Sequence, residues 1–276
     1  MKTIRLGNFP EDSYQMKESL RALKTNIQFC GDDVKTILVT STAPNEGKST
    51  VVLDLARSMS ESGKSVLVID ADIRKSVLVG RLRAKSESGS IYGLSHFLSG
   101  QHSLDDCLCT TNVQNLYMIF AGPSVPNPTE ILDNHYFEEL MRLCKEKFDY
   151  ILIDCPPIGA AIDAAVIARH VDGAIIVVAQ GMMQSRAIMN TKKQLETSNV
   201  RILGAVLNKA KVKHSVYGKY YGNYYGNYYG GYYGNYGSYG TYGDAKPEKT
   251  ASNEKALKSV DKATKRDKKK SDQEVF

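Results

Sequence analysis

The fold is decided by the stretch from Thr36 to Thr50, which reads TILVTSTAPNEGKST. Its first five residues are apolar or β-branched and predict a buried strand, and the residues that follow the stretch have helical spacing. Between the two, Gly47, Lys48 and Ser49 match the pattern G-x-x-x-x-G-K-[ST], except that Thr42 replaces the first glycine. The stretch therefore predicts a strand, a loop that binds phosphate groups, and a helix.

The residue types in this loop suit the phosphates of a nucleotide. Backbone N–H groups of the loop and of the helix N-terminus can point at the phosphates, where the helix dipole favours negative charge. Lys48 would add a positive charge, the Ser49 hydroxyl would ligate Mg²⁺, and Gly47 would let the backbone approach without a Cβ in the way. The alternative, a coincidental glycine turn, leaves the flanking strand and helix unexplained.

Strands alternate with helices along the chain. Apolar, β-rich runs predict strands at Thr36–Thr40, Ser65–Ile69, Tyr150–Ile153, Ala174–Ala179 and Ile202–Leu207. Helical spacing predicts helices at Ser13–Phe29, Ser49–Ser60, Asn134–Lys147 and Ser185–Thr197. This order predicts an α/β fold, with a mostly parallel sheet that has helices on both faces.

Acidic residues follow two of these strands. Asp70 and Asp72 come after the second strand together with Arg74, and Asp154 comes directly after Ile153. Ligands bind at the carboxyl edge of open α/β sheets, so these side chains are expected beside the phosphate loop, with Asp154 in a Walker B-like position. A helix N-cap is the alternative for each aspartate. Arg74 either neutralises a phosphoryl group or pairs with a neighbouring carboxylate, and both interpretations stay open.

Charge is unevenly distributed along the chain. The 276 residues carry a net charge of +6, but residues 209–276 hold 14 basic against 7 acidic side chains, so residues 1–208 sum to −1. A fold that binds nucleic acid should be basic on its surface, so we expect no nucleic acid partner. Five cysteines without C-x-x-C spacing, no apolar leader and no run of about 18 apolar residues indicate a cytoplasmic protein.

The last quarter of the chain has an unusual composition. Residues 217–243 repeat Tyr-Tyr-Gly-Asn units and contain twelve Tyr and nine Gly but no aliphatic residue, so we expect them to be mobile in the free protein. Residues 244–276 are rich in lysine, and we expect them to be disordered. We therefore divide the chain into an N-terminal segment 1–35 with an oligomerisation helix, a phosphate-loop domain 36–210, a Tyr/Gly-rich tail 211–243 and an extension 244–276.

Short segments spread over residues 13–243 form a specific set. They are Glu18–Arg21 with Lys24–Ile27, Pro44–Thr50, Asp70–Arg74, Gly93–Gly100, Ala121–Pro123 with Pro126–Glu130, Asp154–Pro157, Asp163–Ala164, Asp172–Gly173 and Gly204–Lys209. With them the chain closely resembles the bacterial tyrosine autokinases of capsular and exopolysaccharide synthesis, in the form of the cytoplasmic kinase subunit of Gram-positive bacteria. The sequence departs from that family at Asn45, where glycine is usual, and at Lys24, Asp54 and Cys155, where Arg, Asn and Thr are usual.

The resemblance implies a P-loop fold of the partitioning-ATPase-like type, with ATP and Mg²⁺ as cofactors. The implied ATP-binding residues are Asn45, Glu46, Gly47, Lys48, Ser49 and Thr50, with Asn208 at the adenine. Mg²⁺ would be organised by Ser49, Asp70 and Asp154, directly or through water. The implied catalytic set is Lys48, Asp70, Asp72 and Asp154, in which Asp72 would orient or deprotonate the tyrosine hydroxyl.

The same resemblance implies that the chain phosphorylates its own tail, mainly in trans within a ring-like homo-oligomer. The expected acceptors are Tyr217, Tyr220, Tyr221, Tyr224, Tyr225, Tyr228, Tyr229, Tyr232, Tyr233, Tyr236, Tyr239 and Tyr242. The subunit-interface motif matches Glu18, Arg21 and Lys24, although an intrahelical Glu18–Arg21 pair is the alternative. A separate transmembrane adaptor would activate the kinase at the inner face of the membrane, and a cognate tyrosine phosphatase would reverse the reaction.

Two other classes compete with this interpretation. An ATPase switch of the partitioning or division-site kind shares the fold, but it carries a signature lysine five residues before the phosphate-loop lysine, where this chain has Ala43. A scaffold built on a self-associating Tyr/Gly tract would explain the tail but not Lys48 and the aspartates. The H-R-D and D-F-G signatures are absent, which excludes the eukaryotic kinase fold.

Overall fold

The computed structural model describes residues 1–7, 9, 13–86 and 89–210. These residues belong to one compact unit that extends from Met1 to Val212. The tail and the extension predicted at 211–243 and 244–276 lie outside the described residues, as do the twelve candidate acceptor tyrosines.

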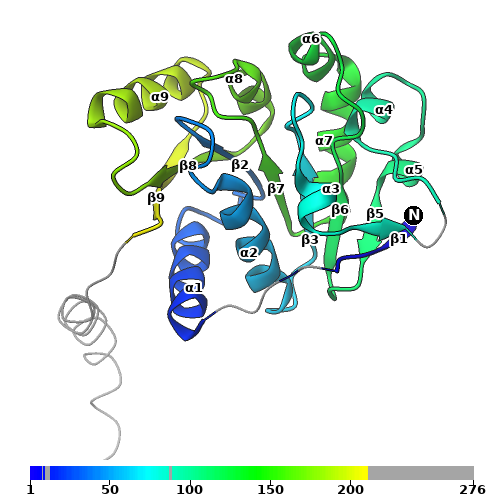
Figure 1. The fold of residues 1–276 in the computed structure, drawn as a ribbon, viewed down its shortest axis with the longest axis horizontal. Helices are drawn as coiled ribbons and strands as arrows, with labels where there is room; N and C mark the ends of the chain where they lie inside the picture. The colour runs from blue at the N-terminus through cyan, green and yellow to red at the C-terminus, as the bar shows by residue number, and fades with distance from the viewer. Residues whose placement is uncertain (8, 10–12, 87–88, 211–276) are drawn as a thin grey trace, which may run out of the picture. The chain divides into compact units, whose positions relative to one another are not determined.

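The centre of this unit is a sheet, in which the described strands run in the order β4-β1-β5-β6-β3-β7-β2-β8-β9 (Figure 1). The strands are β1 (Lys2–Arg5), β2 (Thr36–Ser41), β3 (Val66–Asp70), β4 (Lys85–Ser86), β5 (Cys109–Thr111), β6 (Leu116–Ile119), β7 (Tyr150–Asp154), β8 (Gly173–Ala179) and β9 (Ile202–Asn208). Neighbours are parallel except in the pairs β1/β4 and β5/β6. The predicted α/β class with a mostly parallel sheet is confirmed.

Helices cover both faces of the sheet. They are α1 (Tyr14–Gln28), α2 (Lys48–Ser60), α3 (Leu78–Arg81), α4 (Leu94–Leu98), α5 (Leu104–Cys107), α6 (Pro128–Leu132), α7 (His135–Lys147), α8 (Asp163–Ile167), a 3₁₀ turn (Ala168–His170) and α9 (Ser185–Thr197). Figure 1 shows α1 beside α2, and the two helices are packed together. Within the described part of the chain, no helix is long and apolar enough to cross a bilayer.

The sheet separates two hydrophobic cores, because side chains alternate between its faces along each strand. On β2, Ile37 and Val39 pack in one core with Val52 of α2, whereas Leu38 packs in the other core with Leu140 of α7. All five side chains are fully buried. A strand that is buried on both faces must be apolar at successive positions, which is why the central strands were recognisable as apolar runs.

Four strands at one side of the sheet, β1, β4, β5 and β6, escaped prediction. Each has only two to four residues, and such short runs do not show a strand period. Because β1 pairs with both β4 and β5, the first residues of the chain are built into the same sheet as the phosphate-loop strand. The predicted N-terminal segment 1–35 therefore shares a sheet with the phosphate-loop domain, and the boundary at residue 35 stays a prediction.

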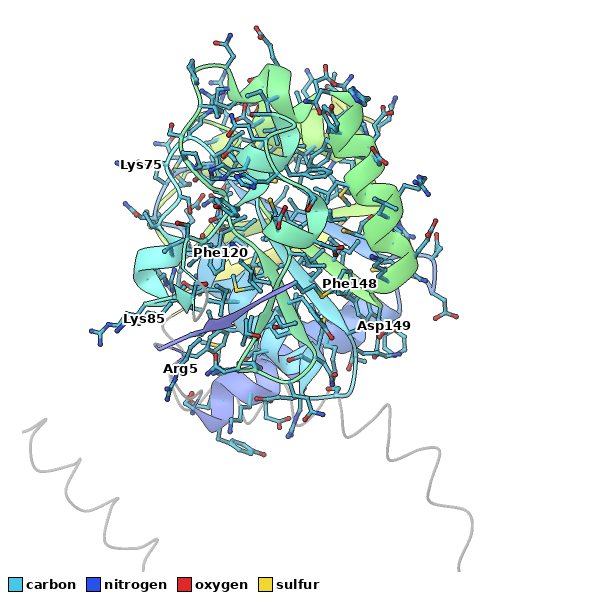
Figure 2. The ribbon with its side chains drawn as sticks, turned by 90° about the vertical axis from the view of Figure 1, so that its right-hand side faces the viewer. Arg5, Lys75, Lys85, Phe120, Phe148 and Asp149 are labelled. Carbon is cyan, nitrogen blue, oxygen red and sulfur yellow. The ribbon has the colours of Figure 1, made fainter. Side chains whose placement is uncertain are left out.

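Figure 2 shows this side of the sheet, where Arg5 and Lys85 extend outward and Phe120, just after β6, lies inside. Arg5 and Lys85 are direct partners in the β1/β4 register. Like charges placed opposite each other weaken a strand pair. The pair therefore depends on the apolar side chains beneath it, Ile4 and Leu6, which are buried.

Candidate active site

The phosphate loop joins β2 to α2, as the sequence predicts. Asn45 and Gly47 have left-handed backbones, with φ of 66° and 91°. Left-handed residues that alternate with other conformations can turn successive N–H groups to one side of a loop, which is the geometry of an anion-binding concavity. Gly47 is the N-cap of α2 and provides no capping side chain, so the first N–H groups of that helix add to the same concavity.

Glu46 supports the loop from behind. Its fully buried carboxylate accepts hydrogen bonds from the N–H of Ala43 at 2.7 Å and from the N–H of Ala179, at the end of β8, at 3.2 Å. Glu46 is one of the residues predicted to bind ATP. Because its side chain is occupied by the protein backbone, only its own N–H group can face a phosphate.

Two aspartates meet at the ends of β3 and β7. Asp70 and Asp154 are direct partners in the strand register, and each is about 1% exposed. Burial, followed by the charge of Asp154, raises the pKa of Asp70 to about 7. Burial also raises the pKa of Asp154, against the opposing effect of Lys48. Two buried carboxylates side by side are stable only with a proton or a cation to offset their repulsion.

Lys48 connects the loop to these aspartates. Its Nζ lies 3.8 Å from Asp154 Oδ1 and 3.8 Å from Asp72 Oδ2. The Ser49 hydroxyl, next in the chain, also lowers the pKa of Asp154. Asp154 Oδ1 has no hydrogen-bond partner among the described residues. The fold therefore brings the predicted Lys48, Ser49, Asp70, Asp72 and Asp154 together at one edge of the sheet.

The oxygen atoms at this edge fit Mg²⁺ in kind and number. No three His, Cys, Asp or Glu side chains gather as a metal site in the described part of the chain. Mg²⁺ does not need such a cluster, because it keeps several waters and takes phosphate oxygens with one or two carboxylates. Asp154 Oδ1, which is buried and accepts no hydrogen bond from the described residues, is a suitable ligand atom, and Ser49 and Asp70 lie beside Asp154.

Asp72 and Arg74 follow β3 in the chain, and their side chains have different partners. Asp72 Oδ1 accepts a hydrogen bond from the N–H of Lys75 at 3.1 Å, while Asp72 Oδ2 lies 3.8 Å from Lys48 Nζ. Arg74 binds both oxygens of the fully buried Asp163, at 2.6 and 2.8 Å, and Asp163 raises the pKa of its guanidinium. Of the two interpretations left open for Arg74, the ion pair is the one observed.

Two further side chains lie at this edge of the sheet, and no motif in the sequence predicted them as site residues. Arg81 of α3 donates from Nη2 to Thr50 Oγ1 at 2.5 Å, and the Ser76 hydroxyl donates to Asp70 Oδ2. The charge of Arg81 also lowers the pKa of Asp154. These contacts depend on the path of the chain after β3, which brings α3 to Thr50 of α2. No local sequence motif predicts that path.

The predicted interface residues lie on α1. Arg21 Nη1 is 2.5 Å from Glu18 Oε1, which is the intrahelical pair foreseen as the alternative, and both side chains are exposed. Lys24 Nζ donates to Ser62 Oγ at 2.6 Å. These contacts lie within one subunit, so the role of the three residues in an oligomer stays a prediction.

A cavity of about 430 Å³ opens beside the first residues of the loop. It is lined by Thr42, Ala43, Pro44, Gly159, Ala160, Met183, Ala187, Asn190, Thr191 and Gln194. The hydroxyls of Thr42 and Thr191 are hydrogen-bonded to each other at 3.1 Å. Its volume is that of a site for a small ligand or a large side chain.

Comparison with known proteins shows the family to which this chain belongs. Residues 34–212 match the AAA domain family. The tyrosine-protein kinase CpsD of Streptococcus agalactiae is 42% identical over 204 residues, which are 74% of this chain and 88% of that protein. The chain belongs to the bacterial tyrosine-protein kinases.

Two further comparisons agree with this kinase family. The kinase domain of the Escherichia coli tyrosine kinase ETK has a TM-score of 0.64 and 28% identity, over 72% of this kinase and 78% of that chain. The tyrosine-protein kinase ptk of Acinetobacter johnsonii is 33% identical over 193 residues, which are 69% of this kinase but 26% of that protein. The predicted enzyme class, a protein-tyrosine kinase, is confirmed.

We expect Asp70→Asn to stabilise the nucleotide-free kinase at neutral pH. The pKa of Asp70 is about 7 in the fold against a reference of 3.8, so the folded state holds one more proton between these values and its stability falls as pH rises through that window. Asparagine does not titrate. Asp70→Asn should therefore gain unfolding free energy relative to the unchanged protein, and this gain should grow by about 2.5 kcal/mol from pH 5 to pH 8.

Urea unfolding at both pH values measures this difference. Asp105→Asn, at an exposed aspartate, is the matched control. A gain for Asp70→Asn that is the same at pH 5 and pH 8 would contradict the raised pKa.

Proposed function

We propose that this kinase transfers the γ-phosphoryl group of ATP to tyrosines of its own C-terminal tail, mainly in trans within an oligomer, and thereby regulates capsular and exopolysaccharide synthesis and export. The observation that carries the proposal is the position of Lys48, whose Nζ lies 3.8 Å from both Asp72 and Asp154 at the start of α2. A cation there, beside the inward N–H groups of the loop, suits a γ-phosphate.

The loop would bind and orient ATP. The N–H groups of residues 45–50 would surround the phosphates, Lys48 would neutralise charge on the γ-phosphate, and Asn208 at the end of β9 would contact the adenine. When bound, Mg²⁺ neutralises charge on the β- and γ-phosphates, and Ser49, Asp70 and Asp154 would hold it directly or through water.

Asp72 would act on the incoming tyrosine. Its side chain is 16% exposed, against 2% for Asp154, so an acceptor can reach it from solvent. In the transfer, the bond between the γ-phosphorus and the bridging oxygen breaks, a bond to the tyrosine oxygen forms, and the phenolic proton passes to Asp72. Because a free tyrosine has a pKa near 10, the proton leaves late, and positioning supplies most of the catalysis.

The composition of the tail supports its role as the acceptor. Twelve tyrosines stand among glycines and asparagines between residues 217 and 243, so a neighbouring site would accept the tail in several registers. Each phosphate adds about −1.5 to −2 charges at neutral pH. Repulsion between phosphorylated tails would then weaken an oligomer held by Glu18, Arg21 and Lys24 of α1.

A membrane partner completes the proposal. About three quarters of the A. johnsonii relative lies outside the part that this kinase matches. We propose that a separate transmembrane adaptor holds this kinase at the inner face of the membrane and raises its activity. A cognate tyrosine phosphatase would remove the phosphates.

Incubation with Mg-ATP should place phosphate on several tyrosines between Tyr217 and Tyr242. In Lys48→Met the yield should fall at least about 100-fold, because the charge on the γ-phosphate loses its partner. Tandem mass spectrometry of the tail, with and without the adaptor's cytoplasmic segment, measures the yield. Lys193→Met, on the exposed side of α9, is the matched control. Unmodified tyrosines with the adaptor present, despite ATP hydrolysis, would instead favour the ATPase switch.

The cavity beside Ala43 is where we expect the acceptor to enter. Ala187→Phe would fill part of it from α9, and because Thr42, Ala43 and Pro44 of the phosphate loop line the same cavity, nucleotide binding is measured beside the transfer. Phosphate transfer to a synthetic Tyr-Gly-Asn peptide should fall about tenfold, the usual size for a blocked side-chain pocket, while the affinity for Mg-ADP stays the same. Met189→Phe on the same helix, at an exposed residue that does not line the cavity, is the control. Equal transfer by Ala187→Phe and the unchanged kinase would exclude this route.

A further inference from the structure

The residues that end β9 hold the outer side of the phosphate loop. Lys209 Nζ donates to the carbonyl oxygen of Asn45 at 2.6 Å, and Asn208 Nδ2 donates to the carbonyl oxygen of Glu46 at 2.9 Å. The N–H of Lys209 in turn donates to Asn208 Oδ1 at 2.8 Å. This last bond fixes the orientation of the Asn208 amide, so that its NH₂ group is the one that faces the loop.

These two carbonyl contacts set the direction of two N–H groups. In a trans peptide unit the carbonyl and the following N–H point in opposite directions. A carbonyl of Asn45 held toward β9 therefore turns the N–H of Glu46 to the opposite side, and a carbonyl of Glu46 held toward β9 does the same for Gly47. That opposite side is the concavity in which we propose that the phosphates of ATP bind.

Asn45 has the least favourable backbone conformation of this arrangement. Its φ of 66° lies in the left-handed region, where a residue with a Cβ is less stable than glycine. Gly47 also has a positive φ, of 91°, but glycine has no Cβ and adopts this conformation readily. A Cβ at this position would lie 2.1 Å from Asn208 Nδ2. Asparagine enters this region more readily than most residues with a Cβ, and the Lys209 ammonium on its carbonyl adds a contact that holds the backbone there.

We propose that Lys209 is a positioning residue of the nucleotide site, which holds the left-handed Asn45 so that the N–H of Glu46 faces the phosphates. Lys209 acts through the loop and does not touch the nucleotide. The inference rests on the proposed function, because it takes the loop as the ATP site. It also gives a physical reason why this chain tolerates asparagine at a position where the family that it resembles has glycine.

Titration with Mg-ADP by calorimetry tests this role. Lys209→Met should weaken the affinity about five- to tenfold, the usual size for loss of a charge-assisted hydrogen bond at an exposed site. Lys209→Arg should keep most of the affinity, since its guanidinium can donate to the same carbonyl. Lys193→Met on α9, at an exposed lysine, should bind as the unchanged kinase does.

A second background separates positioning from direct contact. In Asn45→Gly the backbone adopts the left-handed conformation without help, so adding Lys209→Met should cost less than about twofold. If Lys209 bound the nucleotide itself, the loss would be the same in both backgrounds, and the proposal would be overturned. Thermal unfolding without nucleotide checks that each variant is folded. If Lys209→Met is not folded, the Mg-ADP affinity is measured on Lys209→Arg instead.

The same titration distinguishes this inference from the proposed function. Absence of Mg-ADP binding by the unchanged kinase would defeat the ATP-dependent function. Normal binding that Lys209→Met leaves unchanged would defeat the positioning role alone.

Discussion

The repulsion between Asp70 and Asp154 is the constraint on which the rest of the site depends. Parallel pairing of β3 and β7 places the two carboxylates side by side, and burial removes the water that would screen them. Some surrounding groups reduce this cost: Ser76 donates to Asp70, and Lys48 and the Ser49 hydroxyl lower the pKa of Asp154. The charge of Asp72 adds to the cost, because it raises the pKa of both aspartates. Burial still leaves the pKa of Asp70 near 7, so this edge of the sheet favours a bound cation.

The phosphate loop is supported on two sides by contacts of different range. In front, Lys48 and Ser49 follow the loop directly in sequence and face the aspartates. Behind, Glu46 reaches Ala179 of β8, and Asn208 reaches Glu46 from the end of β9. The first set belongs to the sequence motif. The second set depends on β8 and β9 lying beside β2, so the loop geometry is a property of the whole sheet.

Sequence alone predicted the central strands, the long helices and the carboxylates at the strand ends, because each has a local signal. The strands β2, β3 and β7 are apolar at successive positions, as burial on two faces requires. What escaped prediction depends on distant partners. The strand β1 exposes most of its side chains and exists through its pairing with β4 and β5. The ion pair of Arg74 with Asp163 depends on the folded path of the chain, because the two residues are far apart in sequence. The same holds for the hydrogen bond from Ala179 to the buried carboxylate of Glu46.

The place of β2 in the sheet also has a consequence for synthesis of the chain on the ribosome. Its two partners are β7 and β8, so Ile37 pairs with Leu152 on one side and with Gly173 on the other. At about 5–20 residues per second, β2 emerges from the ribosome roughly 5 to 20 s before its first partner strand. During that time a strand that is buried at every position in the folded protein has no partner strand. The phosphate loop likewise acquires its contact with Asn208 only after residue 208 has been made.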